Sequence, residues 1–247
     1  MRTAACLVVG NEILSGKIEE KNVAVLARML FSLGIEFRRV VTCKDEIPTI
    51  AREVNELRAS HDLVFTSGGI GPTHDDITID GVAVAFGVPL DREPRIADAI
   101  RAYYGDACTE HHLRMANLPR GADYVGETDP VFTTLRMGNV HVLPGVPWLF
   151  ARKLEGLRPL LDAGEAFVNR TVFLRGDEGD YAELLERIAN THPGVDAGSY
   201  LAPAGADYDC RVTFDSASAS AAQGAADAFV AETDPAKVVR RGDSGSA

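Results

Sequence analysis

The chain has 247 residues, enough for one large domain or for one medium and one small domain. Its 25 Lys and Arg residues against 36 Asp and Glu residues give a formal net charge of −11. This charge argues against a nucleic-acid partner, because Lys and Arg must neutralise phosphates, and it disfavours docking on an anionic membrane. No stretch approaches the roughly 20 apolar residues of a membrane span, so we expect no membrane partner.

Cysteine usage and the N-terminal residues bear on the compartment. The four cysteines lie far apart, with no C-x-x-C pair, which is typical of small buried side chains in a reducing environment. The apolar segment at residues 4–9 is much shorter than a signal region. We therefore expect a cytoplasmic protein.

The first half of the chain alternates strand and helix patterns. The apolar run at 4–9 predicts a buried parallel strand, and residues 10–16 predict a loop. Apolar residues spaced as on one helix face follow up to Gly34, and the next predicted elements are a strand at 37–42, a helix at 47–57 and a strand at 63–65. Three such alternations imply a parallel sheet with right-handed crossovers.

The second half predicts a different arrangement. Helices are expected at about 93–104 and 110–117, a hairpin at 132–143 and a helix through Trp148. The predicted order from about residue 169 is strand 171–174, helix 181–190, strands 195–201 and 210–214, helix 218–232 and a short strand at 238–239. This order is typical of a ferredoxin-like α+β domain. We therefore expect an α/β domain at 1–166, a small α+β domain at 167–240 and a disordered tail at 241–247.

A glycine-rich stretch at 66–78 separates a predicted buried strand from a predicted helix. Glycines at 68, 69 and 71 permit positive φ and close approach of a ligand, and their amides with the following helix N-terminus can seat a phosphate. The dinucleotide motif does not fit, because His74 occupies the position of its last glycine. The triphosphate loop does not fit, because Pro72 follows Gly71 where a lysine is required. The acidic pair Asp75 and Asp76 beside a phosphate indicates a divalent cation, with Asp76 as the candidate ligand and Asp75 better explained as its solvated neighbour.

Three other loops leave predicted strands at the same edge of the sheet, where ligands bind in such folds. They carry Asn11 with Glu12, Lys44 with Asp45, and Pro144 with Gly145. We therefore predict one site. Its ligand-binding residues are Gly68, Gly69, Ile70, Gly71, Thr73, Glu12, Asn11, Pro144 and Gly145, and its acidic residues are Asp76 and Asp45.

The ordered string at 66–78 resembles the signature of the molybdopterin-binding domain family. That family includes molybdenum-cofactor biosynthesis proteins, the N-terminal domain of competence/damage-inducible protein A and a domain of some FAD synthetases. Residues 10–16 and 143–147 resemble two further family motifs, except that Asn11 replaces an aspartate and Val146 an asparagine. The resemblance implies a three-layer fold with a parallel-type sheet and a homo-oligomer. It also implies a pterin or ADP-containing ligand such as molybdopterin, with Mg²⁺ or a similar cation at Asp76 and Asp45, which would be both catalytic and metal-binding.

Several interpretations stay open at this point. Asp76 is also a common N-cap residue, and Asp45 followed by Glu46 is also a capping pattern. The candidate activities are metal-dependent pyrophosphate hydrolysis of ADP-ribose-like or FAD-like compounds and adenylyl transfer to molybdopterin. A non-catalytic pterin- or nucleotide-binding module is the alternative, and the replacements at Asn11 and Val146 favour it.

Overall fold

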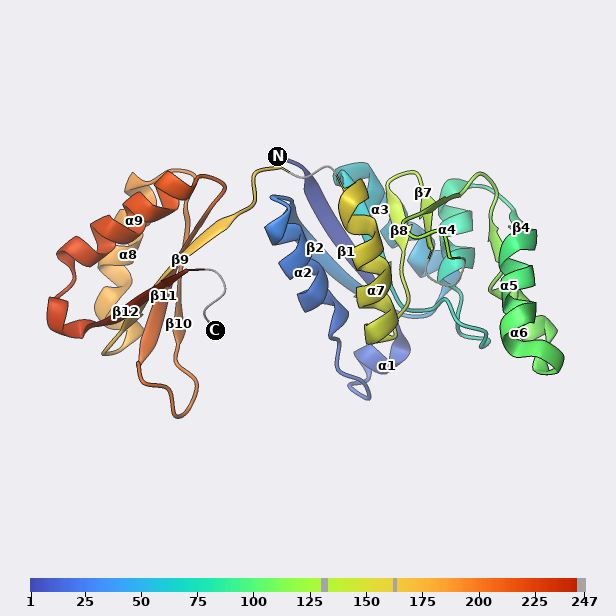
Figure 1. The fold of residues 1–247 in the computed structure, drawn as a ribbon, viewed down its shortest axis with the longest axis horizontal. Coiled ribbons are helices and arrows are strands. Elements are labelled where there is room, and N and C mark those ends of the chain that lie inside the picture. Colours follow the sequence, from blue (N-terminus) through green and yellow to red (C-terminus); the bar gives the residue numbers. More distant parts are fainter. Residues whose placement is uncertain (130–132, 162–163, 244–247) are drawn as a thin grey trace. The chain divides into compact units, whose positions relative to one another are not determined.

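The computed structural model describes residues 1–129, 133–161 and 164–243 (Figure 1). The chain divides into two compact units, Met1–Gly164 and Glu165–Ala247.

The first unit is built on a six-stranded, largely parallel sheet. Its strand order is β2 (Glu36–Cys43), β1 (Thr3–Val9), β3 (Leu63–Ser67), β8 (Val140–Val142), β7 (Thr134–Met137) and β6 (Asp123–Val125). The pairs β1–β2, β1–β3 and β3–β8 are parallel, and the pairs β7–β8 and β6–β7 are antiparallel. The predicted α/β class and the hairpin are therefore confirmed.

Helices cover both faces of this sheet (Figure 1). One apolar cluster joins Ala4, Cys6 and Val8 of β1 to α2 (Asn22–Ser32) and α7 (Pro147–Leu157). The residues between them on β1 pack in a second cluster against α3 (Ile47–Ser60) and α4 (Thr78–Phe86). Because both sides of β1 are buried, its sequence is continuously apolar rather than alternating.

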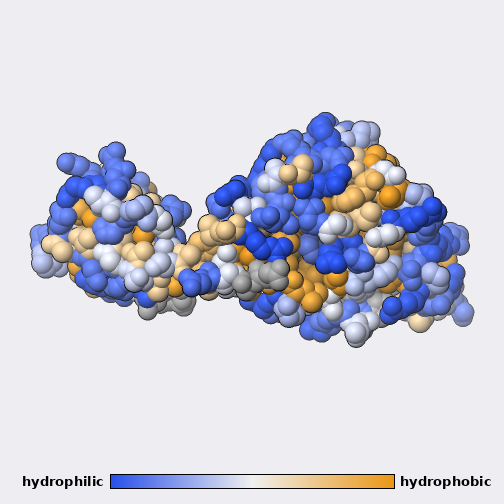
Figure 2. Space-filling model, turned by 90° about the horizontal axis from the view of Figure 1, so that it is seen from above, coloured by the Kyte–Doolittle hydropathy of each residue, from blue (hydrophilic) through white to orange (hydrophobic). Residues whose placement is uncertain are grey.

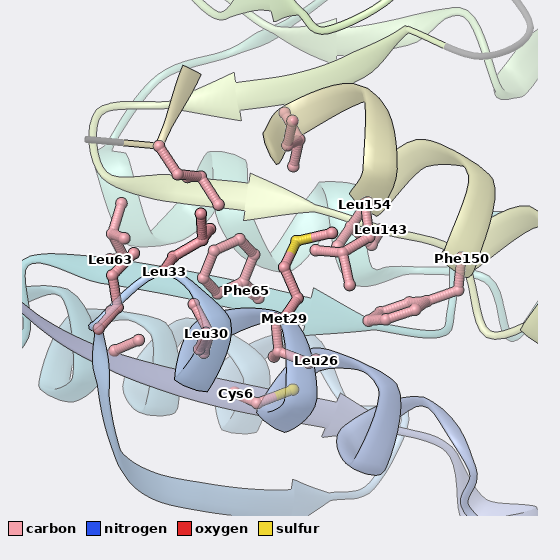
Figure 3. Close-up of a cluster of buried hydrophobic side chains, with 14 of the residues drawn as sticks. Cys6, Leu26, Met29, Leu30, Leu33, Leu63, Phe65, Leu143, Phe150 and Leu154 are labelled. Carbon is pink, nitrogen blue, oxygen red and sulfur yellow. The ribbon is translucent and has the colours of Figure 1, made fainter. Parts of the chain in front are cut away.

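Side chains from distant segments interdigitate in the first of these clusters (Figure 3). Leu26, Met29 and Leu30 of α2 lie over the strands, and Phe150 and Leu154 of α7 extend the cluster around Leu143. This packing holds α2 and α7 against the ends of β1 and β3, where the polar loops begin.

Several elements differ from the prediction. Residues 11–14 form a short helix, α1 (Asn11–Leu14), instead of a loop, because Ser15 N donates to Asn11 O over 2.9 Å. The short strands β4 (Leu90–Arg92), β5 (Asn117–Pro119) and β6 were not predicted, since three residues show no periodicity. The helices of this region are α5 (Pro94–Tyr104), η1 (Gly105–Ala107), α6 (Glu110–Arg114) and η2 (Arg158–Leu160).

The second unit has the predicted α+β order, with two short 3-10 helices in addition and a longer last strand than predicted. Its elements are β9 (Val168–Leu174), η3 (Glu178–Tyr181), α8 (Ala182–Thr191), β10 (Asp196–Leu201), β11 (Cys210–Ser216), α9 (Ala219–Glu232), η4 (Pro235–Lys237) and β12 (Val238–Asp243). The sheet is antiparallel in the order β10-β11-β9-β12, which is the ferredoxin-like arrangement. The expected disordered tail from residue 241 is corrected for residues 241–243, which pair with β9.

The molecular surface is mixed in character. Figure 2 shows hydrophilic and hydrophobic residues interspersed over the face seen from above. Within the described residues, no helix combines the length and apolarity needed to cross a membrane.

Candidate functional site

The glycine loop is held by backbone contacts from the two neighbouring strands. Gly68 and Gly69 have φ angles of 103° and 66°, which favour glycine. A Cβ atom on Gly68 would lie 2.2 Å from the carbonyl oxygen of Val9, at the end of β1. A Cβ atom on Gly145, after β8, would lie 3.2 Å from the Cα atom of Gly68. The exits of β1, β3 and β8 therefore meet at Gly68, as the predicted common edge requires.

Asn22 joins these loops from the first residue of α2. Its side chain is 3% exposed, and its Nδ2 atom donates to Ser67 Oγ over 2.8 Å and to the carbonyl oxygen of Gly145 over 2.9 Å. Its Oδ1 atom is buried without a hydrogen-bond partner. The sequence analysis missed Asn22 and Ser67, because a polar residue at a helix start or a strand end is an ordinary feature.

Asp45 and Glu12 lie at the exits of the neighbouring strands β2 and β1. Asp45 Oδ2 accepts a hydrogen bond from the backbone N–H of Asn11 over 2.7 Å. The Glu12 carboxylate folds back, so that a Cβ atom on Gly10 would lie 2.5 Å from Glu12 Oε1. The N-cap of α3 is Glu46, without a side-chain capping bond, so the Asp45 carboxylate links two loops instead of capping that helix.

Asp76 is held within the glycine loop itself. Its Oδ2 atom accepts hydrogen bonds from the backbone N–H and the hydroxyl of Thr73, over 2.9 and 2.5 Å. The N-cap of α4 is Ile77, again without a side-chain capping bond, so the capping role considered for Asp76 is not observed. Gly71 permits this arrangement, because a Cβ atom there would lie 2.6 Å from Asp76 Oδ2.

The backbone amides of the loop fall into two groups. The N–H of Gly68 donates to Leu143 O over 3.2 Å, so this glycine contributes close packing instead of a free donor. The N–H groups of Gly69, Ile70 and Gly71 find no acceptor among the described residues. Thr78, at the start of α4, anchors the loop by donating its N–H to Gly69 O and its hydroxyl to Gly68 O, both over 2.9 Å.

A small pocket of about 30 Å³ opens beside this loop. Its lining includes Ile70, Gly71 and Asp76 together with Arg114 and Asn117 from a segment about forty residues later. The lining of one pocket therefore includes both Arg114 and Asp76.

His74, His112 and Arg136 do not line this pocket. His74 has a 97% exposed side chain, and His112 accepts from Thr109 N over 3.1 Å and stacks on Tyr104. Arg136 pairs with Asp123 over 2.8 Å.

The protein side chains of the site do not form a complete set of metal ligands within the described residues. The described part of the chain contains no group of three or more His, Cys, Asp or Glu side chains arranged around one ion position. Asp45 and Asp76 belong to two separate hydrogen-bonded loops. A carboxylate such as that of Asp76 is of the type that binds Mg²⁺ when substrate phosphates and water supply the other oxygens, and a cation shared by Asp76 and Asp45 stays a prediction.

Comparison with known proteins agrees with the geometry of this edge. Residues 5–163 match the family described as a probable molybdopterin binding domain, and residues 166–242 match the middle domain of FAD synthase. The chain belongs to the molybdopterin-binding domain family. The predicted resemblance is thus confirmed.

Individual relatives come from several organisms. A probable FAD synthase of Caenorhabditis briggsae is 30% identical over 226 residues, covering 81% of this chain and 43% of that protein. A CinA-like protein of Myxococcus xanthus is 36% identical over 169 residues, covering 64% of this chain and 40% of that protein. The crystal structure of CinA from Thermoplasma acidophilum, a protein described as of unknown function, is similar with a TM-score of 0.59 and 31% identity. It covers 64% of this chain and 96% of that one. The chain thus spans less than half the length of the C. briggsae FAD synthase and the M. xanthus CinA-like protein.

Proposed function

We propose that the first unit binds a phosphate-bearing pterin or ADP-containing compound at the carboxyl edge of β1, β2 and β3. The observation that carries the proposal is the set of N–H groups at Gly69, Ile70 and Gly71, which have no acceptor among the described residues and precede the N-terminus of α4. Such a group of amides at a helix start attracts a phosphate. Arg114 and Asn117, on the adjoining pocket wall, add donors for the same anion.

We further propose that the unit hydrolyses the pyrophosphate of an ADP-ribose-like or FAD-like compound. Water would attack one phosphorus atom and the bridging P–O bond would break, giving AMP and a second phosphate monoester, with the water proton passing to solvent. Mg²⁺ held by Asp76 and Asp45 would supply charge neutralisation on the phosphate oxygens. Thr73 would keep the Asp76 carboxylate oriented, since both of its donors bind one oxygen and leave the other for the cation.

A second candidate function is ligand binding without catalysis. Adenylyl transfer to molybdopterin is a separate, catalytic alternative. The module is favoured by Asn11, which replaces the acidic residue of the family motif, and by Val146, which is 49% exposed after the Pro144–Gly145 turn. A non-catalytic module would be stabilised by its ligand without forming product, because binding raises stability by RT ln(1 + [L]/Kd).

The test combines binding with turnover. FAD, ADP-ribose, ATP and molybdopterin are each added with and without Mg²⁺, while the melting temperature and AMP release are followed. We expect Asp76→Asn to reduce Mg²⁺-dependent AMP release by about a hundredfold or more, which is the scale for loss of a group that stabilises transition-state charge.

Asp75→Asn is the matched control, because Asp75 is the adjacent carboxylate with a 58% exposed side chain. It should leave AMP release nearly unchanged. Equal turnover in wild type and Asp76→Asn would refute the hydrolysis. Ligand stabilisation without any AMP release would establish the binding module instead.

A further inference from the structure

An exposed tryptophan lies at the start of α7, next to the proposed ligand-binding edge. Trp148 is the single tryptophan of the chain and is 65% exposed, although tryptophan side chains are on average highly buried. Val146, just before it, is 49% exposed. Ligand sites are lined mainly by apolar and aromatic side chains with a few polar groups among them. An apolar surface of this kind therefore adjoins the polar glycine loop.

The fold places this surface beside the glycine loop. Strands β3 and β8 are parallel neighbours, so the loop after β3 and the turn after β8 leave the same edge of the sheet. Asn22 Nδ2 donates to Gly145 O over 2.9 Å, and a Cβ atom on Gly145 would lie 3.2 Å from the Cα atom of Gly68. Trp148 follows Gly145 by three peptide bonds, so their Cα atoms are at most about 11 Å apart.

The geometry of α7 directs the indole ring away from the core and towards this edge. The buried residues of α7 are Phe150, Lys153, Leu154 and Leu157. At about 3.6 residues per turn, Trp148 lies on the opposite side of the helix from them. Figure 3 shows Phe150, in the same turn, directed into the apolar cluster. Helical side chains tilt towards the N-terminus, and Trp148 is the second residue of α7, so its ring covers the turn at Gly145 and Val146.

We propose that Trp148 stacks on the planar heterocycle of the ligand whose phosphate binds the amides of Gly69, Ile70 and Gly71. Pterin, adenine and isoalloxazine rings share a flat π-surface, and an aromatic side chain stacks on any such surface. The inference rests on the proposed function of the first unit. It adds to that function the residue that recognises the ring, as distinct from the groups that recognise the phosphate.

The two faces of the sheet divide these tasks. Ile70 packs in the apolar cluster of α3 and α4, and the pocket that contains Arg114 and Asn117 lies on this side. Helix α7 packs in the cluster on the other face, so Trp148 lies on the opposite side of the glycine loop from that pocket. This arrangement suits a compound that carries its phosphate and its heterocycle at separate ends.

The test measures recognition of the ring separately from recognition of the phosphate. The compounds are α,β-methylene-ADP, whose P–C–P bridge resists hydrolysis, molybdopterin, and methylenediphosphonate, which has no ring. Each is added with Mg²⁺ to the full chain, while Trp148 fluorescence is followed and the Kd is measured by calorimetry. We expect a compound with a ring to quench the emission and methylenediphosphonate to leave it unchanged. Whichever ring compound binds more tightly identifies the class of heterocycle.

Trp148→Ala should raise the Kd of the bound ring compound by about tenfold or more, the scale for the loss of one aromatic stack. The Kd of methylenediphosphonate should stay the same, and Trp148→Phe should restore most of the affinity for the ring compound. Leu160→Ala is the matched control, because Leu160 is an exposed apolar residue, 55% exposed, beyond the opposite end of α7. It should leave every Kd unchanged. Far-UV circular dichroism should be the same for all variants, since both side chains lie largely in solvent.

The possible failures are distinguishable. If neither ring compound binds the wild type, the proposed function fails and this inference fails with it. If a ring compound binds without quenching Trp148, or binds Trp148→Ala as tightly as the wild type, this inference alone is overturned. A Trp148 emission maximum that shifts when the ligand-free chain is diluted would show that a second copy of the chain covers the ring, and would also overturn it.

Discussion

The two units treat their buried polar groups differently. In the first unit, Asn22 Oδ1, Thr134 Oγ1 and His141 Nδ1 are buried without hydrogen-bond partners, whereas the described part of the second unit contains no such atom. Asn169 of β9 illustrates the second unit: it donates to Asp215 over 2.6 Å and accepts from Thr171 over 2.7 Å. A buried polar atom without a hydrogen-bond partner lowers the free energy of unfolding. The first unit therefore carries a destabilising contribution that the described part of the second unit lacks.

The difference follows from the sheets. Strands β1 and β3 of the first unit are buried on both sides, so Thr66 and Ser67 at the end of β3 are buried as well. In the second unit, helices α8 and α9 contribute to the apolar cluster on one side of the sheet, and the other side carries residues such as Arg211 and Tyr200. Local rules tend to be broken where a protein has a site, so this difference agrees with our proposal that the ligand binds to the first unit.

The largest loss of stability is expected from Gly68→Ala, which tests whether the backbone of Gly68 must lie in close contact with the end of β1. The new Cβ atom would lie 2.2 Å from Val9 O, a backbone atom, at a φ of 103°. We expect the free energy of unfolding of the first unit to fall by about 4 kcal/mol, and ligand stabilisation to be lost. Gly87→Ala is the control within the same unit: its φ is also positive, but nothing lies within 4 Å, so about 1 kcal/mol is expected. Chemical denaturation followed at Trp148, the single tryptophan, measures both, and equal costs would contradict the packing argument.

The next effect concerns the buried histidine of β8. His141 is 6% exposed and stacks on Phe65 with ring centroids 5.1 Å apart. Burial lowers the pKa of His141 from 6.5 to about 4, against hydrogen bonding that favours the charged form, and the Arg136 and Arg2 charges act with burial. The unfolded chain therefore binds a proton more readily than the folded one, and stability falls as pH drops from 6.5 towards 4.

The expected loss for His141 is about 3 kcal/mol across that pH range. His141→Phe keeps an aromatic ring beside Phe65 and removes the titrating group. Between pH 6.5 and pH 4, the unfolding free energy of this variant should therefore fall by about 3 kcal/mol less than that of the wild type. Denaturation at several pH values, again followed at Trp148, gives both slopes. Parallel slopes for wild type and variant would show that other groups cause the acid sensitivity.

Sequence patterns were sufficient for the architecture because the apolar runs are long. The continuous run of β1 and the helical spacing of α2 predict buried elements of the correct type, and the order of the second unit predicts its sheet class. The glycine loop was predictable as well, because positive φ at Gly68 and Gly69 requires glycine. Short pieces such as α1 and β4 were not, since three or four residues are held by tertiary contacts and not by their own pattern.

The hydrogen-bond partners of the site residues could not be predicted from the sequence. That Asp45 binds the Asn11 amide, and that Asp76 binds Thr73 instead of capping α4, depends on loop geometry that residue types do not encode. Arg114 and Asn117 reach the glycine loop through the fold of α6 and β5, about forty residues away in the chain. Such long-range convergence has no local signature.

The smallest of the three effects compares two asparagines, one from each unit. Asn22→Ala removes both N–H donors that tie Ser67 and Gly145 together and leaves the buried Ser67 hydroxyl without this partner. The cost should be about 2 kcal/mol, reduced by the removal of the unpartnered Oδ1 atom. Because the Gly145 loop packs on Gly68, we also expect weaker stabilisation by the ligands that bind the wild type.

Asn169→Ala in the second unit is the matched control. Asn169 and Asp215 are partly exposed, so water can replace the bond between them, whereas the hydroxyl of Thr171 is buried. About 1 kcal/mol is therefore expected. Thermal unfolding with and without ligand separates the two results, since only Asn22→Ala should reduce the ligand-induced shift in melting temperature. If both variants kept the full shift, Asn22 would contribute packing alone, and its unpartnered oxygen would be a cost without a connection to the site.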